Sequence, residues 1–374
     1  MKTMLPLQNS DPLTTLRGFL RQLLETGVVE AIFLPLEVDG GATLPALVTD
    51  PAWLDQADPL TPVMPINSAR AVSALTNKHS PARLGVVLRP CEIRALIELV
   101  KLQQATLEGV TLIGLDCPGT YEVAEYIEGK RAGHTDLADY LEIAREGRQP
   151  ALEGPSLRPA CQMCDQPVPE HVDIHLHLFG LGMDQAIPVT LSDEIAGKLG
   201  LSQGSQPAAD ERQTIVDRLT TARRQVRETE LTAIRERLDA DGGLASLFAT
   251  CIRCHNCMTV CPICYCKTCL FKTAAFDHPP EHYLNAARRK GAVRMLGDTL
   301  LFQLTRLNHM SASCVSCGMC TSACPADIPV GAIFSAVGAQ VQAAFDYRPG
   351  RDVSEPLPLI TFHPNEWTQI GEEK

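Results

Sequence analysis

The hydrophobic pattern of the first half of the chain predicts alternating strands and helices. Residues 82–90, ARLGVVLRP, form an apolar run with the length of a buried strand, and residues 109–117, GVTLIGLDC, form another. Between them, CEIRALIELVKLQQ places apolar residues at helical spacing, at Ile93, Leu96, Ile97 and Val100. This order is a β-α-β unit with parallel strands. We expect an α/β domain with parallel β-α-β units over residues 1–185.

The next segment, residues 186–248, predicts a linker and a long charged helix. Residues 199–211 are rich in Gly, Ser, Pro and Gln, which is the composition of a linker. After them the apolar residues fall on one helical face, at Ile215, Leu219, Ala222, Val226, Leu231, Ile234 and Leu238. Such a helix either binds a partner or braces the core, and we favour the brace.

Residues 171–178, HVDIHLHL, alternate polar and apolar side chains, as in a strand with one buried face. His175 and His177 would share the polar face, where two histidines can bind a metal. A solvated face explains the same alternation, and we prefer that explanation.

Cysteine is the most informative residue type in the second half. The chain has 15 cysteines, seven of them between Cys251 and Cys269. A disulfide framework is a poor explanation, because the number is odd and because 374 residues with 45% hydrophobic content can bury a core without staples. The first residues lack the apolar run of a secretory signal, and no stretch approaches the ~20 apolar residues of a membrane span. We expect a cytoplasmic protein whose reduced thiols are available as metal ligands.

The spacing of eight cysteines predicts two 4Fe-4S clusters. The pattern C-x2-C-x2-C-x3-C followed by proline occurs twice, at Cys251, Cys254, Cys257 and Cys261 and again at Cys314, Cys317, Cys320 and Cys324. In this bacterial ferredoxin pattern the fourth cysteine of each run binds the cluster of the other run. Cluster one would then have Cys251, Cys254, Cys257 and Cys324, and cluster two Cys314, Cys317, Cys320 and Cys261. Zinc sites also use C-x2-C pairs, but zinc does not need the duplicated third and fourth cysteines.

Around these runs we expect an α-helical ferredoxin-type domain over residues 249–330. The 52 residues between the runs, 262–313, exceed what a compact ferredoxin needs. Their apolar residues predict a helix packed on the cluster core, with Val293, Leu296, Leu300, Leu301 and Leu304 near one face. Residues 331–374, with several prolines toward the end, are expected to form an extended tail that wraps a neighbour.

Four further cysteines are candidates for a third 4Fe-4S cluster. Cys91 and Cys117 each follow a predicted strand, so both should lie at the carboxyl edge of one sheet, where open α/β sheets bind ligands. Cys161 and Cys164 form a C-x2-C pair in a loop. Zinc binding and buried free thiols are the alternatives. The helix start beside Cys91 should lower the pKa of its thiol.

Three cysteines remain, Cys264, Cys266 and Cys269. They lack a fourth thiol, and His255 and His278 are the candidate outside ligands. The alternative is that they only stabilise the ferredoxin fold.

Charge is distributed unevenly along the chain. The net charge is −11, yet residues 251–330 hold eight Lys and Arg against four Asp and Glu, which is +4. Cations near an anionic cluster favour its reduction. The acidic balance of the whole chain argues against nucleic acid as a partner, because phosphate binding needs a basic surface.

The chain resembles the beta-subunit family of coenzyme F420 hydrogenase and formate dehydrogenase, which are flavin- and iron-sulfur-containing electron-transfer subunits. The matching segments are GVVEAIFLPLEVDGGATLPALV at 27–48, RPCEIRALIELVKL at 89–102, IGLDCPGT at 113–120 and CIRCHNCMTVCPICYC at 251–266. In many members the ferredoxin module comes first, whereas here it comes last.

The resemblance implies FAD on the α/β domain and electron transfer between a two-electron carrier and the clusters. It also implies a catalytic dehydrogenase or hydrogenase subunit as partner, together with other electron-transfer subunits or ferredoxin. Two loops offer support from the residues themselves. Pro118, Gly119 and Thr120 would present amides to a phosphate, and Gly40 and Gly41 would permit a close backbone approach, although a glycine pair is also a common turn. The alternative function is a flavin-free adapter that wires partner subunits together.

Overall fold

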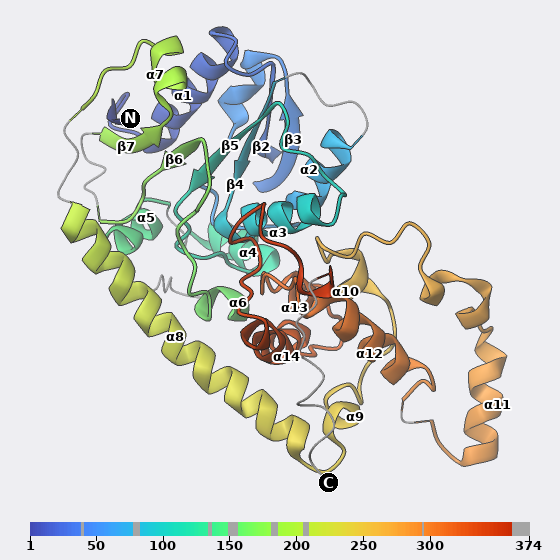
Figure 1. Ribbon diagram of the computed structural model, residues 1–374. Coiled ribbons are helices and arrows are strands. Elements are labelled where there is room, and N and C mark those ends of the chain that lie inside the picture. Colours follow the sequence, from blue (N-terminus) through green and yellow to red (C-terminus); the bar gives the residue numbers. More distant parts are fainter. Residues whose placement is uncertain are drawn as a thin grey trace.

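The computed structural model describes residues 1–38, 41–77, 83–133, 137–148, 156–180, 186–204, 209–293 and 295–360 (Figure 1). Its described strands form one seven-stranded sheet in the order β1-β7-β6-β5-β4-β2-β3. The strands are β1 Lys2–Pro6, β2 Ala31–Val38, β3 Ala42–Val48, β4 Leu84–Leu88, β5 Val110–Leu115, β6 Ile174–Leu176 and β7 Ala186–Leu191. β2, β4, β5 and β6 are mutually parallel, and antiparallel strands close both edges. The expected α/β fold with parallel β-α-β units is confirmed.

Alternating residues of the central strands fill two hydrophobic cores, one on each face of the sheet. Ile32 and Leu34 of β2 belong to the core that also contains helix α1 (Pro12–Glu25), while Phe33 belongs to the core of α2 (Ala69–Thr76) and α3 (Pro90–Lys101). Every residue of β4 is buried, as expected for a strand covered on both faces. The other helices of this part are η1 Pro51–Gln56, α4 Val123–Ala132, α5 Leu137–Arg145, α6 Pro159–Gln162 and α7 Asp193–Lys198.

The helix α8 (Ala209–Asp239) connects this part to the cysteine-rich part. It runs along the molecule from the sheet to the carboxyl-terminal helices and packs against α14 (Figure 1). Leu219 is buried at its sheet end, and Leu231 and Ile234 are buried at the other. The preferred interpretation of this segment as a brace is confirmed.

The cysteine-rich part is built from short helices around a second core. Its elements are α9 Gly243–Leu247, α10 Asn256–Thr259, η2 Leu270–Lys272, η3 Ala274–Phe276, α11 Pro280–Lys290, α12 Thr299–Met310, α13 Met319–Ser322, α14 Val330–Ala344 and η4 Pro358–Ile360. Phe302, Ile333 and Phe334 lie at the centre of this core, which the cysteines of both runs adjoin.

The segment between the two runs differs from the expected single helix. It contains α11 and α12, separated by residues 291–298. Leu301 and Leu304, expected to pack on the core, are 51% and 52% exposed. The core side of α12 is instead occupied by larger side chains, including Phe302 and Arg306.

Two expected boundaries also need correction. β7 extends the sheet beyond residue 185, because its alternating apolar residues pair with both β1 and β6. The tail is not extended from residue 331, because α14 buries Ile333 and Phe334 in the second core.

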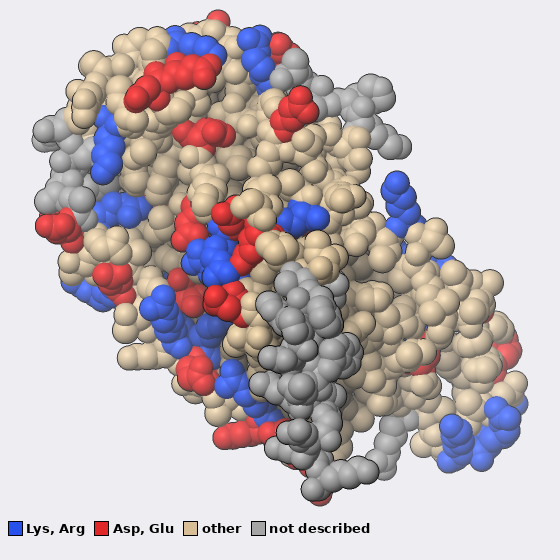
Figure 2. Space-filling view, in the orientation of Figure 1, with Lys and Arg blue, Asp and Glu red and all other residues tan. Residues whose placement is uncertain are grey.

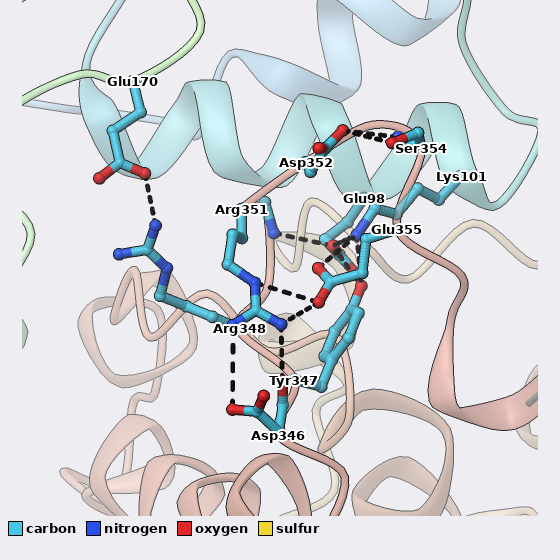
Figure 3. Close-up of polar contacts among 11 residues, drawn as sticks. Glu98, Lys101, Glu170, Asp346, Tyr347, Arg348, Arg351, Asp352, Ser354 and Glu355 are labelled. Carbon is cyan, nitrogen blue, oxygen red and sulfur yellow. Dashed lines mark hydrogen bonds and ion pairs between the residues drawn. The ribbon is translucent and has the colours of Figure 1, made fainter.

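The described residues after α14 pack on α3 of the same chain (Figure 3). Tyr347 donates to both oxygens of the fully buried Glu98 at 2.6 and 2.8 Å, and the Gly350 amide donates to the same carboxylate at 2.8 Å. Lys101 lies 3.3 Å from Glu98 and 3.4 Å from Glu355. Hydrogen-bonded charges thus attach the described tail to the α/β part, and residues 361–374 lie outside the described residues.

None of the helices in the described ranges combines the length and the apolar character that crossing a bilayer requires.

Candidate iron-sulfur sites

The two ferredoxin-type runs adopt matching local structures. In each, the residue after the second cysteine caps a short helix in the left-handed conformation, His255 (φ 63°) before α10 and Gly318 (φ 73°) before α13. The residue two positions earlier is also left-handed, Arg253 (φ 56°) in one run and Ser316 (φ 56°) in the other. These turns fold each loop tightly around its thiols, so the sequence repeat is also a structural repeat.

The thiols of the two runs influence one another in the crossed pattern that cluster exchange requires. Burial raises the pKa of Cys257, nearby Arg306 lowers it, and the thiols of Cys251, Cys254 and Cys324 raise it further. Cys324 belongs to the other run. Burial likewise raises the pKa of Cys261 to about 12, nearby Arg306 lowers it, and the thiols of Cys317 and Cys314 raise it further. Each run therefore places its fourth thiol beside the other run.

Arg306 of α12 is one of the eight basic residues of the segment 251–330, and the sequence alone did not distinguish it from the others. Its guanidinium is buried and donates to Cys257 Sγ at 3.1 Å and to the Cys257 carbonyl at 3.1 Å. The guanidinium carbon lies 4.6 Å from the centre of the Phe334 ring. A buried cation that touches a thiol compensates the negative charge of a thiolate.

The four cysteines of the expected third set also come together. Cys91 lies in the first turn of α3 after β4, Cys117 follows β5, Cys161 lies in α6 and Cys164 follows it. Burial raises the pKa of Cys117 to about 12, Arg89 lowers it, and the thiols of Cys161 and Cys164 raise it further. The expectation for Cys91 was wrong in sign: burial, Glu92 and the Cys117 thiol raise its pKa well above the ordinary value. Desolvation outweighs the helix terminus here.

Buried arginines surround this third set. Arg89, Arg158 and Arg223 are 6%, 2% and 0% exposed. Arg223 donates to the Pro118 carbonyl and, at 3.5 Å, to the Cys164 carbonyl, while Arg158 donates to the Cys317 carbonyl and the Met319 thioether. Among the described residues neither forms an ion pair with a carboxylate. An uncompensated buried charge is costly, so this environment is suited to an anionic group held by the thiols.

A sequence signal for two of these arginines exists. LRPC at 88–91 places Leu-Arg-Pro directly before a cysteine, and LRPAC at 157–161 places it one residue before a cysteine. In both, the arginine is the N-cap and the proline is the first helical residue, of α3 and of α6. The shared motif therefore positions one cation and one thiol together at each helix start.

The third set lies next to the second ferredoxin run. Arg158 contacts both Cys317 and Met319, and a Cβ added to Gly318 would stand 2.2 Å from the Cβ of Ala160. The Cys317 thiol is one of the charges that raise the pKa of Cys91. The third thiol set therefore adjoins the second ferredoxin-type set, which in turn adjoins the first.

The residues proposed for flavin phosphates have other contacts. In the loop 118–120 the Pro118 carbonyl accepts a hydrogen bond from Arg223, and the Gly119 carbonyl accepts one from Tyr140. The Thr120 carbonyl accepts one from the Arg158 amide at 2.9 Å. The donors of the loop face sulfur: the Gly119 amide bonds Cys117, and Thr120 Oγ1 lies 3.3 Å from Cys161 Sγ. The loop thus surrounds the third thiol set. Gly41 (φ 78°) belongs to the turn between β2 and β3, and Gly40 lies outside the described residues.

His175 and His177 lie close to Asp116, with ligand atoms of all three within 4.8 Å of one another. The carboxylate is already neutralised, because Arg212 of α8 donates to both of its oxygens at 2.7 Å. His175 bonds Asp116 at 2.9 Å, and His177 bonds Thr190 at 2.8 Å. We interpret this cluster as the contact that fixes α8 to the sheet rather than as a metal site.

Comparison with known proteins agrees with this geometry. Residues 247–328 match the 4Fe-4S dicluster domain, a range that contains all eight ferredoxin-type cysteines. The beta subunit of the F420-dependent formate dehydrogenase of Methanocaldococcus jannaschii is 27% identical over 303 residues, covering 73% of this chain and 75% of that one. The beta subunit of F420-dependent formate dehydrogenase 1 of Methanococcus maripaludis is 25% identical, covering 94% and 96%.

This chain is similar to those beta subunits. The resemblance expected from the sequence is confirmed, and in the M. maripaludis beta subunit the likeness extends over nearly the whole length. Among solved structures, a chain of the F420-reducing [NiFe] hydrogenase complex from Methanosarcina barkeri matches with 13% identity and a TM-score of 0.43, covering 58% of this chain and 85% of that chain.

Proposed function

We propose that this protein is the iron-sulfur electron-transfer subunit of a multisubunit oxidoreductase such as a formate dehydrogenase or a hydrogenase. The observation that carries the proposal is that the three thiol sets adjoin one another. The match to the dicluster domain and the similarity to the beta subunits also support the proposal. When bound, 4Fe-4S clusters take up and release single electrons. Catalysis of formate or hydrogen oxidation belongs to a partner subunit, and further electron-transfer subunits or ferredoxin are the remaining partners.

The proposed ligand sets are those expected from the sequence. Cys251, Cys254, Cys257 and Cys324 hold one cluster; Cys314, Cys317, Cys320 and Cys261 hold the second; and Cys91, Cys117, Cys161 and Cys164 hold a third. The buried arginines around the third set favour an anionic cluster over free thiols, because burial disfavours uncompensated charge.

FAD is the other proposed cofactor, and it exchanges paired electrons for single ones when bound. Its support is the resemblance, together with a cavity of about 400 Å³ beside Pro90, at the carboxyl end of β4. The cavity is lined by Arg94, Arg212, Arg224 and Arg348 and also by the carboxylates of Asp165, Glu170 and Asp217. Arg212, Arg224 and Arg348 form ion pairs with Asp116, Asp165 and Glu170. Arg94 is thus the lining guanidinium best placed to bind a phosphate.

A flavin-free adapter is the second candidate, favoured by the contacts of residues 118–120, which surround thiols rather than an open phosphate site. Acid treatment of the anaerobically purified protein separates the two functions. About one released FAD per chain supports the flavin-containing subunit, and protein with full iron but without flavin supports the adapter.

The ligand sets are tested by iron analysis of Cys257→Ala, Cys320→Ala and Cys117→Ala. Each variant should lose about four irons per chain, one cluster's content. Ser322→Ala, an exposed change in the same helix as Cys320, should keep all of its iron. Full iron in Cys257→Ala and Cys320→Ala would disprove the dicluster assignment, and full iron in Cys117→Ala would disprove the third cluster alone.

A further inference from the structure

Three cysteines outside the twelve proposed ligands line one surface pocket. Cys264, Cys266 and Cys269 lie on a pocket of about 400 Å³ formed by residues 258–273 together with Arg70 of α2. Cys266 is exposed, and Cys264 and Cys269 are partly buried. All three thiols are therefore accessible from one solvent-filled space.

The pocket has the chemistry of a site for an anionic sulfur-bound group. Its lining contains three cations, Arg70, Lys267 and Lys272, and no carboxylate. Cys269 Sγ also lies 3.6 Å from the thioether of Met258. Soft sulfur ligands of this kind favour iron-sulfur clusters, zinc or copper(I), and the surrounding positive charge favours thiolates.

The spacing of the three thiols fits a cluster better than a single ion. In the described part of the chain, Asp116, His175 and His177 form the group whose three ligand atoms all lie within 4.8 Å of one another. The sulfur atoms of Cys264, Cys266 and Cys269 are therefore not all within 4.8 Å of one another. The same is true of the sulfur atoms of the ferredoxin-type cysteines. Thiolates of a 4Fe-4S cluster bind different irons and stand farther apart than ligands that share one tetrahedral ion.

We propose that Cys264, Cys266 and Cys269 hold an additional iron-sulfur cluster in this pocket, through three thiolates. The site lies one turn beyond Cys261, since the Cys264 amide donates to the Cys261 carbonyl at 3.3 Å. It therefore adjoins the second ferredoxin-type set and is open to solvent on its other side. No fourth thiol is among the residues that line the pocket, so one iron is left for a water or another exogenous ligand.

The test compares the full-length protein with the variant Cys264→Ala/Cys266→Ala/Cys269→Ala, both reconstituted without oxygen from ferrous iron and sulfide. The variant should hold about four irons fewer per chain. In the iron-loaded wild-type protein, iodoacetamide should leave all three thiols unmodified when the peptides are analysed by mass spectrometry. Thr268→Ala, a pocket-lining change that keeps every thiol, should match the wild type in both measurements.

Full iron in the triple variant would overturn the proposal, as would alkylation of Cys266 and Cys269 in the iron-loaded protein. Stoichiometric zinc that disappears in the triple variant would overturn it too, in favour of a mononuclear site. If the triple variant does not accumulate, Cys266→Ala provides the same comparison, because this thiol is exposed. If this proposal fails, the proposed function still stands, because the proposed function is tested separately by Cys257→Ala and Cys320→Ala.

Discussion

Arg306 shows how a single buried residue can adjust a cluster. It donates directly to Cys257 Sγ and lies near the thiols of Cys261 and Cys320, lowering the pKa of each. Because a reduced cluster is more negative than an oxidised one, a cation in this position stabilises the reduced form. Arg306 should therefore raise the reduction potential of the clusters that it adjoins.

Arg306→Gln should lower a cluster potential by on the order of 60 mV, equivalent to a tenfold shift in a one-electron equilibrium. The measurement is an anaerobic redox titration followed by paramagnetic resonance, with iron content as the check that the clusters are present. Arg288→Gln, on the exposed side of α11, is the matched control and should leave the potentials unchanged. Equal potentials in wild type and Arg306→Gln, at equal iron content, would refute this function of Arg306.

The cysteine ligands could be proposed from the sequence, whereas the buried cations that reach them from distant helices could not. Thiol spacing along the chain is fixed by the short loops that wrap a cluster, so the repeat is visible without a structure. Arg306 reaches Cys257 from α12, 49 positions away. Arg223 reaches the Cys164 carbonyl from the middle of α8. Such contacts depend on how helices pack, and no local pattern encodes them.

At the scale of elements, α8 is held at each end by a different kind of contact. Its far end is held by apolar packing of Leu231 and Ile234, and its near end by the ion pair of Arg212 with the fully buried Asp116. Burial alone would raise the pKa of Asp116, but hydrogen bonding by His175 and the nearby positive charges lower it to about 2. The carboxylate is thus ionised in the folded protein over the physiological range.

The neighbouring His177 makes this junction sensitive to acid. Burial, and then His175, lower the pKa of His177 from 6.5 to about 3. Below pH 6.5 the unfolded chain therefore binds a proton that the folded chain does not, so the stabilising effect of neutral His177 is complete above pH 6.5 and declines toward pH 3. His177→Gln should remove a slope of about 1.4 kcal/mol per pH unit from the free energy of unfolding between pH 6 and 5.

Urea unfolding at several pH values measures this slope. His309→Gln, which changes an exposed histidine of α12, is the control and should keep the wild-type slope. Parallel pH dependences in wild type and His177→Gln would show that His177 does not link folding to protonation.

The elements that the sequence predicted well are those whose burial follows a simple period. β4, α3 and β5 each have a regular apolar pattern and pack on one sheet, so their order and parallel pairing could be inferred. The tail could not, because it is attached by Tyr347, Glu98 and Lys101, polar residues about 250 positions apart (Figure 3). Long-range polar contacts leave no periodic signal.

At the scale of the whole molecule, the sheet and the cysteine-rich helices form two bodies joined by α8, and α11 projects away from both, while α12 packs against α14 (Figure 1). The end of α11 carries a basic group, formed by Arg288, Arg289 and Lys290, and acidic side chains lie elsewhere on the same side of the molecule (Figure 2). Leu284 of α11 is 59% exposed, in addition to the half-exposed Leu301 and Leu304 of α12. Leu301 and Leu304 are three positions apart and so share one side of α12, where an exposed apolar pair is suited to contact with a partner.

The two sides of α12 have different environments. One side contacts cluster-one thiols, through Arg306 to Cys257 and through Gln303 to Cys251 at 3.8 Å. The opposite side presents Leu301 and Leu304 to solvent. A partner bound there would be separated from the first thiol set by about one helix diameter, ~10 Å. This surface is therefore suited to the catalytic subunit of the proposed complex, which must exchange electrons with a cluster.

Leu301→Glu/Leu304→Glu should abolish co-purification of the catalytic subunit, because two charges would be buried without partners at the interface. Both residues are half exposed, so the isolated variant should fold and keep its full iron content. Val353→Glu is the control, because it places a carboxylate at an exposed apolar position of the tail. The measurement is anaerobic affinity purification from the native host with identification of the retained subunits. A catalytic subunit that stays bound to the leucine variant, and is lost with Val353→Glu instead, would place the contact on the α/β side.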